Sequence, residues 1–87
     1  MYRVLFSRKA EKSLQKIPKD YQRKVKNAIN SLSVDPRRFG VIRISGVSKA
    51  DKRLRVGEYR ILFKINDDKK AVIIGDIKRR TTTTYRH

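Results

Sequence analysis

The chain has 87 residues, no cysteine, and 24 lysines and arginines against 8 aspartates and glutamates, which gives a formal net charge of +16. This length predicts one domain, residues 1–87, with a modest core, and the lack of cysteine excludes disulfides, thiol catalysis and zinc–thiolate sites. The charge predicts a polyanionic partner, either nucleic acid or an acidic protein. The sequence has no apolar run that could span a bilayer and no signal-peptide pattern, so we expect a cytoplasmic protein without membrane contacts.

The first segment predicts a short strand and then a helix. Residues 2–6 are rich in β-forming side chains, and Ser7 after them is typical of a helix N-cap. The apolar residues that follow recur at the i, i+4, i+7 spacing of one helical face: Ala10, Leu14 and Ile17. Pro18 then ends this helix, because proline lacks a backbone donor and clashes with the preceding turn.

A second helix is expected to begin at Lys19 or Asp20 and to stop before Asp35. Its apolar stripe covers three turns of one face: Tyr21, Val25, Ala28, Ile29 and Leu32. Its opposite side is polar and basic: Arg23, Lys24, Lys26 and Asn30. A solvated surface is the first interpretation of those residues, and a binding site is the alternative. The short link around Pro18 predicts that the two helices are antiparallel neighbours.

The second half of the chain predicts strands. The expected order is a short extended piece at 41–44 between two loops, a β-hairpin at 53–65, a turn at 66–70, a strand at 71–77 and an irregular, exposed end. We therefore expect an α+β domain of order β-α-α-β-β-β. Its antiparallel strands pair in sequence, and the two-helix hairpin packs on one face of the sheet. The other face stays open.

The hairpin at 53–65 fixes a cross-strand register. Apolar and cationic residues alternate on both sides of Gly57-Glu58, and glycine at the first central position suits a two-residue type II′ turn. The predicted partners are Val56 with Tyr59, Arg55 with Arg60, and Leu54 with Ile61. The apolar pairs should face the core, and the arginines should face outward.

The pairing of Arg55 with Arg60 is unexpected, because like charges directly opposed across two strands destabilise a sheet. Arg53 lies on the same side, two residues before Arg55. A very basic chain with a solvated sheet face would tolerate this arrangement. The alternative is a preformed anion site, and phosphate is the first candidate for a cluster of guanidinium groups.

Regular pairing across the 66–70 turn predicts which residues of the last strand join this open face. Gly75 should lie beside Arg60 and leave room for a ligand, and Arg79 should join the other arginines. The same alternation turns Lys78 away from the open face.

The whole pattern resembles the RelE toxins of the RelE/ParE superfamily, the toxic half of type II toxin–antitoxin modules. The most specific part is the hairpin RLRVGEYRILFKI at 53–65, followed by Lys78-Arg79-Arg80 ahead of Tyr85. The resemblance covers nearly the whole chain. It implies a ribosome-dependent endoribonuclease that needs no cofactor and cuts mRNA in the A site by attack of the 2′-hydroxyl on the adjacent phosphate. It also implies a cognate antitoxin, the ribosome and mRNA as partners.

The resemblance further implies the residues of the site. The expected catalytic set is Arg53, Arg55, Arg60, Arg79 and Tyr85, and Lys78 and Arg80 are expected to contact RNA or the ribosome. Arg60 and Arg53 would clamp the scissile phosphate, and Arg79 would assist the leaving 5′-oxygen. No metal site is expected, because turn solubility explains the Asp67-Asp68 pair.

The general base is open between Lys78, Tyr85 and a group on the ribosome. The described RelE enzymes have lysines where this chain has Arg53 and Arg55, and arginine does not give up its proton. Lys78, at a position where many relatives have histidine, is one candidate, and Tyr85 is another. Because the predicted alternation turns Lys78 away, we expect Tyr85 to act as the base or to orient the nucleotide.

Two other functions fit the same charge. A ParE-like toxin would share the fold, act on DNA gyrase and lack the nuclease residues. A non-catalytic basic module would bind RNA through charge alone. The presence of all five expected catalytic residues favours the nuclease.

Overall fold

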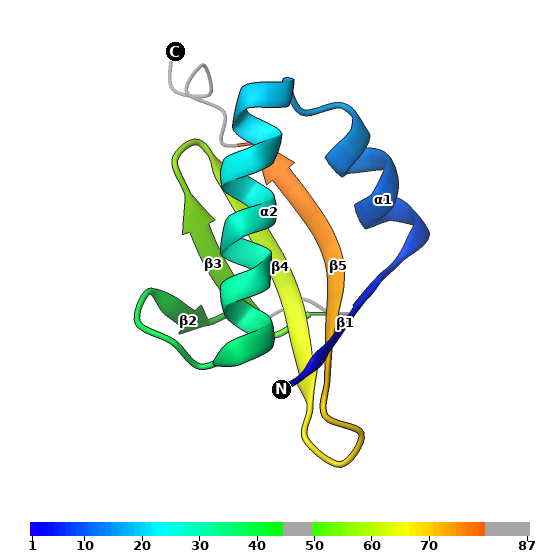
Figure 1. The fold of residues 1–87 in the computed structure, drawn as a ribbon, viewed down its shortest axis with the longest axis vertical. Helices are drawn as coiled ribbons and strands as arrows, with labels where there is room; N and C mark the ends of the chain where they lie inside the picture. The colour runs from blue at the N-terminus through cyan, green and yellow to red at the C-terminus, as the bar shows by residue number, and fades with distance from the viewer. Residues whose placement is uncertain (45–49, 80–87) are drawn as a thin grey trace.

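The computed structural model describes residues 1–44 and 50–79 of the chain. The elements in chain order are β1 (Arg3–Phe6), α1 (Arg8–Gln15), α2 (Lys19–Val34), β2 (Val41–Arg43), β3 (Lys52–Val56), β4 (Tyr59–Asn66) and β5 (Ala71–Arg79). The strands form one sheet in the order β1-β5-β4-β3-β2 (Figure 1). The α+β class is confirmed, as are the two consecutive helices between β1 and the remaining strands. The short extended piece is β2, a further strand that the predicted order does not count.

Both helices form where the sequence predicts them, except that α1 ends at Gln15 and leaves Ile17, which was predicted on its apolar face, in the link to α2. Ser7 caps α1, because its Oγ accepts a hydrogen bond from the Ala10 backbone N–H at 3.0 Å. α1 ends before Pro18, and Pro18 is the N-cap residue of α2. Within the described part of the chain, neither helix has the length and apolar character needed to cross a membrane.

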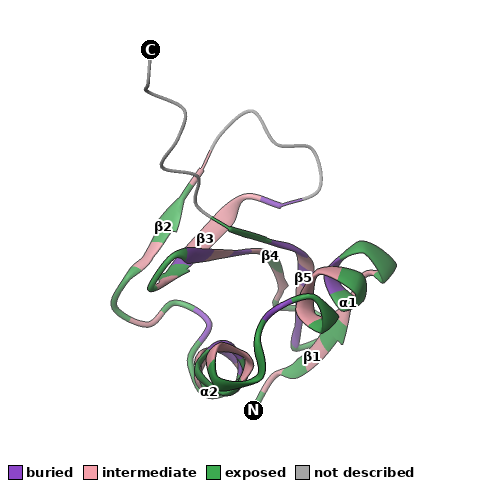
Figure 2. Ribbon diagram, turned by 90° about the horizontal axis from the view of Figure 1, so that it is seen from above, coloured by how far each residue is buried: buried purple, intermediate pink, exposed green. Residues whose placement is uncertain are grey.

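α2 lies across one face of the sheet and buries its predicted stripe there (Figure 2). Val25, Ile29 and Leu32 are buried, and Tyr21 and Ala28 pack against the core from partly exposed positions. The sheet contributes the facing side of the core: Leu54, Tyr59, Ile61, Phe63, Val72, Ile74 and Ile77. Burial of this apolar surface holds α2 on the sheet. The opposite face of β3 and β4 is mostly charged, with Leu62 among its cations.

β1 pairs in parallel with β5, so the sheet is mixed instead of purely antiparallel. The other four strands pair in sequence order, as predicted. β1 accompanies β5 only from Ala71 to Ile74, and α1 packs against the rest of β5. Ser13 of α1 donates a hydrogen bond to Asp76 Oδ1 at 2.9 Å, and the Lys9 ammonium lies 3.7 Å from Asp76 Oδ2. α1 is therefore fastened to β5 where the pairing with β1 has ended.

The β3–β4 hairpin has the predicted register. Val56 pairs with Tyr59, Arg55 with Arg60, and Leu54 with Ile61. Gly57 has a φ of 58° and Glu58 does not have positive φ, as a type II′ turn requires. The turn is also held from α2, because the Tyr21 hydroxyl accepts a hydrogen bond from the Glu58 backbone N–H at 3.2 Å.

The pairing of β4 with β5 contains a β-bulge that the alternation of the sequence does not predict. The register shifts between Leu62 and Phe63, which leaves Gly75 as an extra residue on β5. Ser7 holds this bulge at two points. Its backbone N–H donates to the Ile74 carbonyl at 2.9 Å, and its Oγ donates to the Gly75 carbonyl at 2.7 Å.

The bulge reverses the expected alternation at the end of β5. Lys78 pairs with Arg60, and Arg79 pairs with Tyr59, a residue of the core. The predictions that Arg79 joins the open face, that Gly75 lies beside Arg60 and that Lys78 turns away are therefore wrong. One extra residue moves every later side chain of a strand to the other face.

A polar cluster ties the N-terminus and the loop after α2 to the β4–β5 turn. Asp67 accepts one hydrogen bond from the Tyr2 hydroxyl at 2.8 Å and two from the Arg37 guanidinium at 3.2 and 2.9 Å. The Arg37 bonds, and then the Tyr2 bond, hold the pKa of Asp67 below its usual 3.8. The Lys70 ammonium lies 5.3 Å from the centre of the Tyr2 ring and completes the cluster.

Substitution of Gly57 tests whether Tyr21 fastens the hairpin turn. A Cβ at this position would collide with the Tyr21 side chain, whose Cζ would lie at 2.7 Å, and the positive φ disfavours alanine. We expect Gly57→Ala to lower the free energy of unfolding by at least about 2 kcal/mol. Gly40→Ala is the control, because Gly40 has a φ of 96° but its Cβ would meet only Leu54 Cδ1, at 3.4 Å. Urea unfolding followed by circular dichroism measures both losses, and equal losses would count against a role for Tyr21.

The Asp67 cluster predicts a pH dependence of stability. Because the folded pKa of Asp67 is lowered, its contribution is complete above the unfolded value of 3.8 and is lost as the pH falls through the folded value. Asp67→Asn should therefore lose less stability than the wild type between neutral pH and pH values below 3.8. Asp68→Asn is the control, because it removes a carboxylate from the same turn and leaves the bonds of Asp67 to Arg37 and Tyr2 in place. Unfolding midpoints measured from neutral pH to below pH 3.8 test this. A wild-type pH profile for Asp67→Asn would contradict the stabilising role of the Asp67 carboxylate.

Candidate active site

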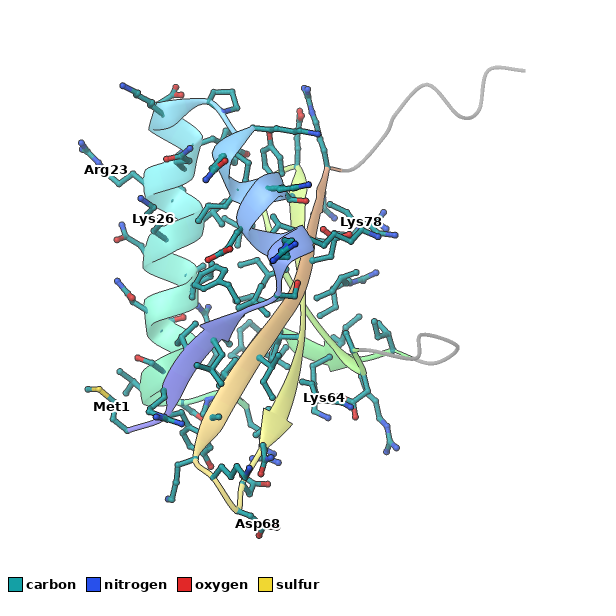
Figure 3. The ribbon with its side chains drawn as sticks, turned by 90° about the vertical axis from the view of Figure 1, so that its right-hand side faces the viewer. Met1, Arg23, Lys26, Lys64, Asp68 and Lys78 are labelled. Carbon is teal, nitrogen blue, oxygen red and sulfur yellow. The ribbon has the colours of Figure 1, made fainter. Side chains whose placement is uncertain are left out.

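A row of three cations crosses the open face of the sheet. The register sets Arg55 of β3 opposite Arg60 of β4, and Arg60 opposite Lys78 of β5. Neighbouring strands lie about 4.8 Å apart, so the three side chains start from adjacent positions. We call Arg55, Arg60 and Lys78 the cationic row. Figure 3 shows Lys78, and Lys64 further along the sheet, extending away from the side covered by α2.

No carboxylate forms an ion pair with the cationic row in the described part of the chain. The ion pairs found there use other cations: Lys9, Arg37, Lys52 and Arg79. The Nε of Arg55 donates to the Gly57 carbonyl at 3.1 Å, which orients the guanidinium and leaves its two terminal nitrogens for a ligand. Arg53 lies two residues before Arg55 on the same face, and it is half-buried, as is Arg60. Positive charge with oriented donors on an open face suits a phosphate group.

Tyr21 supports the site from behind, and sequence reasoning missed this role. The apolar stripe of α2 assigns Tyr21 to the core, yet its hydroxyl holds the Glu58 N–H in the turn. Arg55 is bonded to Gly57 in the same turn, so Tyr21 positions Arg55 through the backbone. The signal in the sequence is one tyrosine in an aliphatic stripe, because a tyrosine hydroxyl near the core requires a hydrogen-bond partner.

Arg79 lies on the helix side of the sheet, apart from the cationic row. Its guanidinium is 3.3 Å from Glu58 Oε1. It borders a hollow of about 310 Å³ whose lining includes Lys16, Pro18 and Tyr59. To reach a phosphate on the open face, this side chain would have to leave Glu58 and pass around the end of β5.

Two expected site residues, Arg80 and Tyr85, lie outside the described residues. Within the described ranges, no three acidic, histidine or cysteine side chains are grouped so that they could hold a metal ion. Asp67, one of the two aspartates considered as a metal ligand, is bonded instead to Arg37 and Tyr2.

The family model of the ParE toxin of type II toxin–antitoxin systems, parDE, matches residues 4–83 of the chain. A comparison with curated protein sequences finds no match. The chain also matches solved structures of RelE toxins. The archaeal RelE of the RelE–RelB complex from Pyrococcus horikoshii is 30% identical with a TM-score of 0.76, and the match covers 93% of this chain and 97% of that chain.

Two further structures share the fold. The match to the RelBE2 toxin–antitoxin complex from Mycobacterium tuberculosis has 28% identity and a TM-score of 0.80, over 91% of this chain and 98% of that chain. The isolated Escherichia coli RelE toxin is 21% identical with a TM-score of 0.76, and the match covers 93% of this chain and 86% of that chain. Because the ParE family model matches most of its length and the RelE structures share its fold, the chain belongs to the ParE toxin family of type II toxin–antitoxin systems, within the RelE/ParE superfamily.

Proposed function

We propose that this toxin is a ribosome-dependent endoribonuclease, which cuts mRNA in the A site and thereby inhibits translation. The main support is the cationic row, Arg55, Arg60 and Lys78, on an open face with Arg53 beside it. Like charges held together against the stability of the sheet are expected where an anion binds. The similarity to RelE toxins supports the same activity.

The proposed cut exchanges one phosphorus–oxygen bond for another. The 2′-oxygen attacks the adjacent phosphorus, the P–O2′ bond forms and the P–O5′ bond breaks, which yields a 2′,3′-cyclic phosphate and a 5′-hydroxyl. The intermediate phosphorane has two negative charges, and guanidinium groups bind such oxygens bidentately. Arg60 and Arg53 would hold the non-bridging oxygens, and Arg55, oriented by Gly57, would fix the phosphate in place.

The reaction also moves two protons, one from the 2′-hydroxyl and one to the 5′-oxygen. Lys78 lies opposite Arg60, and its ammonium can donate a proton to the leaving 5′-oxygen. We therefore assign to Lys78 the role at the leaving 5′-oxygen that was expected of Arg79, because Arg79 is bound to Glu58 on the other side of the sheet. Tyr85 keeps its proposed role as base or as the group that orients the nucleotide. Arginines are poor proton acceptors, so a ribosome that holds the mRNA in line would add much of the rate.

DNA gyrase is the second candidate target, because the matching family model is that of the ParE toxin. Primer extension on mRNA translated in vitro, run beside a gyrase cleavage assay, separates the candidates. Cuts at codon positions that require ribosomes would support the nuclease. Gyrase–DNA cleavage complexes without mRNA cuts would overturn it in favour of a ParE-like toxin. RNA binding without either effect would indicate a non-catalytic module.

We also propose a cognate antitoxin, as in the RelE–RelB complexes that share this fold. Val4, Phe6, Leu14 and Ile29 line a groove of about 280 Å³ between β1, α1 and α2, bordered by Lys26 and Asn30. This apolar groove, with one cation, Lys26, at its border, suits an amphipathic helix whose polar side is acidic. Growth of a host that expresses the toxin alone should stop, and co-expression of the antitoxin should restore it.

Arg60→Ala should remove toxicity by slowing cleavage strongly, and it should leave the fold intact. Loss of one such phosphate contact should cost about 10²–10³-fold in the cleavage rate. Removal of the like-charge pair should hold or raise stability by a few tenths of a kcal/mol. Lys64→Ala is the control, because Lys64 is an exposed cation on the same face of β4 but lies outside the cationic row. Single-turnover cleavage on programmed ribosomes measures the rates, and a fully active Arg60→Ala protein would remove the site assignment.

Lys78→Arg separates proton donation from charge. Arginine keeps the positive charge but does not release a proton, so we expect Lys78→Arg and Lys78→Ala both to lose about 10²-fold in rate at neutral pH. If Lys78 contributes charge alone, Lys78→Arg will retain the wild-type rate and pH profile.

Tyr85→Phe, measured across the same pH range, should remove the dependence of the cleavage rate on the base. A wild-type rate for Tyr85→Phe would move that role to the ribosome.

A further inference from the structure

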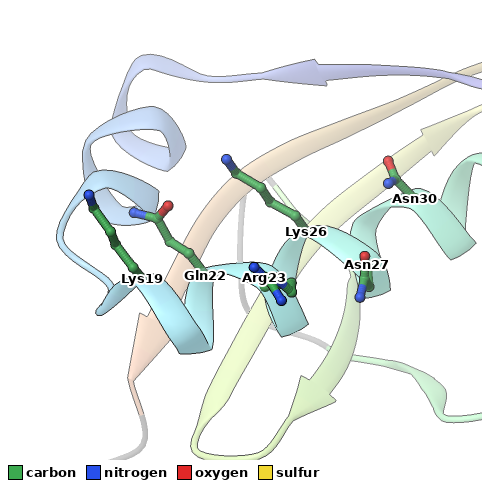
Figure 4. A pocket seen from close by; sticks show the side chains of 6 residues that line it. All are labelled: Lys19, Gln22, Arg23, Lys26, Asn27 and Asn30. Carbon is green, nitrogen blue, oxygen red and sulfur yellow. The ribbon is translucent and has the colours of Figure 1, made fainter.

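A second basic surface lies on the outer side of α2, away from the cationic row. The residues that line a hollow of about 460 Å³ along this helix are Lys19, Gln22, Arg23, Lys26, Asn27 and Asn30 (Figure 4). Figure 3 shows Arg23 and Lys26 extending from the side of the molecule opposite to Lys78. We call Lys19, Arg23 and Lys26 the α2 cations. The sheet and the core separate them from the cationic row.

Folding alone does not explain the α2 cations. They stand at i, i+4 and i+7, so they are neighbours on one helical face, where like charges cost about 0.2–0.5 kcal/mol per pair. Lys19 is also the first residue of α2, where the helix dipole disfavours positive charge. All three side chains are exposed, and none takes part in an ion pair within residues 1–44 and 50–79.

The chemistry of the lining favours RNA over a protein partner. It consists of cationic and amide side chains, which are the types that contact phosphate and sugar oxygens in nucleic acids. The central parts of protein interfaces are instead rich in aromatic residues and methionine and poor in lysine. The lining of this hollow contains no aromatic residue or methionine and includes two lysines. The groove beside it is instead lined mainly by apolar side chains.

The lining also favours double-stranded over single-stranded RNA. Single strands are held by bases stacked on aromatic side chains, and no aromatic residue lines this hollow. Double-stranded RNA is recognised through its backbone and shape. Recognition by shape requires a surface of fixed geometry. The Gln22 Nε2 donates to the carbonyls of Leu14 and Ile17 and so fixes α2 to the end of α1 and the link after it.

We propose that the outer face of α2 binds the phosphate backbone of double-stranded RNA, while the cationic row on the opposite side acts on a single strand. The α2 cations make the ionic contacts, and Asn27 and Asn30 add hydrogen bonds to phosphate or sugar oxygens. A structured RNA and the strand to be cut are then held on two sides of one small domain. This binding does not depend on cleavage.

The test uses fluorescence anisotropy with a labelled RNA hairpin whose stem has about 16 base pairs. The test variant is K19Q/R23Q/K26Q. The control variant is R8Q/K12Q/K69Q, which removes three exposed positive charges from α1 and the β4–β5 turn. We expect the test variant to bind the hairpin at least about tenfold more weakly, and the slope of log K against log salt to fall by about 2–3. The control variant should lose less than about threefold.

Circular dichroism establishes that both variants are folded. Equal losses of hairpin affinity in the two variants would mean that overall charge alone binds the RNA, and would overturn the proposal. Unchanged hairpin affinity with lost binding of an oligo-glutamate peptide would also overturn it, and would assign the surface to an acidic protein. The proposed nuclease is tested independently: a protein that cuts no mRNA but shows the expected hairpin result would retain this inference and lose only the nuclease.

Discussion

The opposition of Arg55 and Arg60 is the constraint on which the rest of the site depends. A two-residue turn fixes the register, and a slip by one residue would expose the buried side chains of Leu54, Tyr59 and Ile61. Burial of each such side chain is worth about 1.5–3 kcal/mol, whereas a like-charge pair costs less than about 1 kcal/mol. The core therefore forces the two arginines together, and the Tyr21 bond to the turn keeps them there.

The third cation of the row depends on a contact far away in the sequence. Lys78 faces Arg60 only because Gly75 is bulged out of the β4–β5 pairing. Ser7 bonds the bulge through its Oγ and also caps α1 through the same atom. One side chain at the junction of β1 and α1 thus helps to decide which residue at the end of β5 joins the cationic row.

These two features show what the sequence could and could not predict. The helices and the hairpin register follow from local signals: apolar spacing, Pro18, and Gly57 between alternating strands. The parallel pairing of β1 with β5 has no such signal, since no short turn joins the two strands. The bulge has none either, because its partner Ser7 lies 68 residues away from Gly75. The face of Arg79 was therefore predicted wrongly, while Arg55 opposite Arg60 was predicted correctly.

The two proposed partners of the helical side would compete. Lys26 and Asn30 border both the apolar groove and the hollow with the α2 cations. A protein helix seated in the groove would therefore cover part of the RNA surface without touching the cationic row. An antitoxin could in this way detach the toxin from structured RNA as well as offset its net charge of +16.

A double-mutant cycle on Arg55 and Arg60 tests most directly whether the sheet holds these side chains together for phosphate. The free energy of unfolding is measured at low salt for the wild type, Arg55→Gln, Arg60→Gln and the double variant. Each is measured alone and with a single-stranded RNA made uncleavable by 2′-deoxy substitution. We predict a repulsive coupling between the two arginines in the free protein and a favourable coupling with RNA bound, because both guanidinium groups then contact one phosphate. A coupling of the same sign in both states, or none in either, would contradict this account.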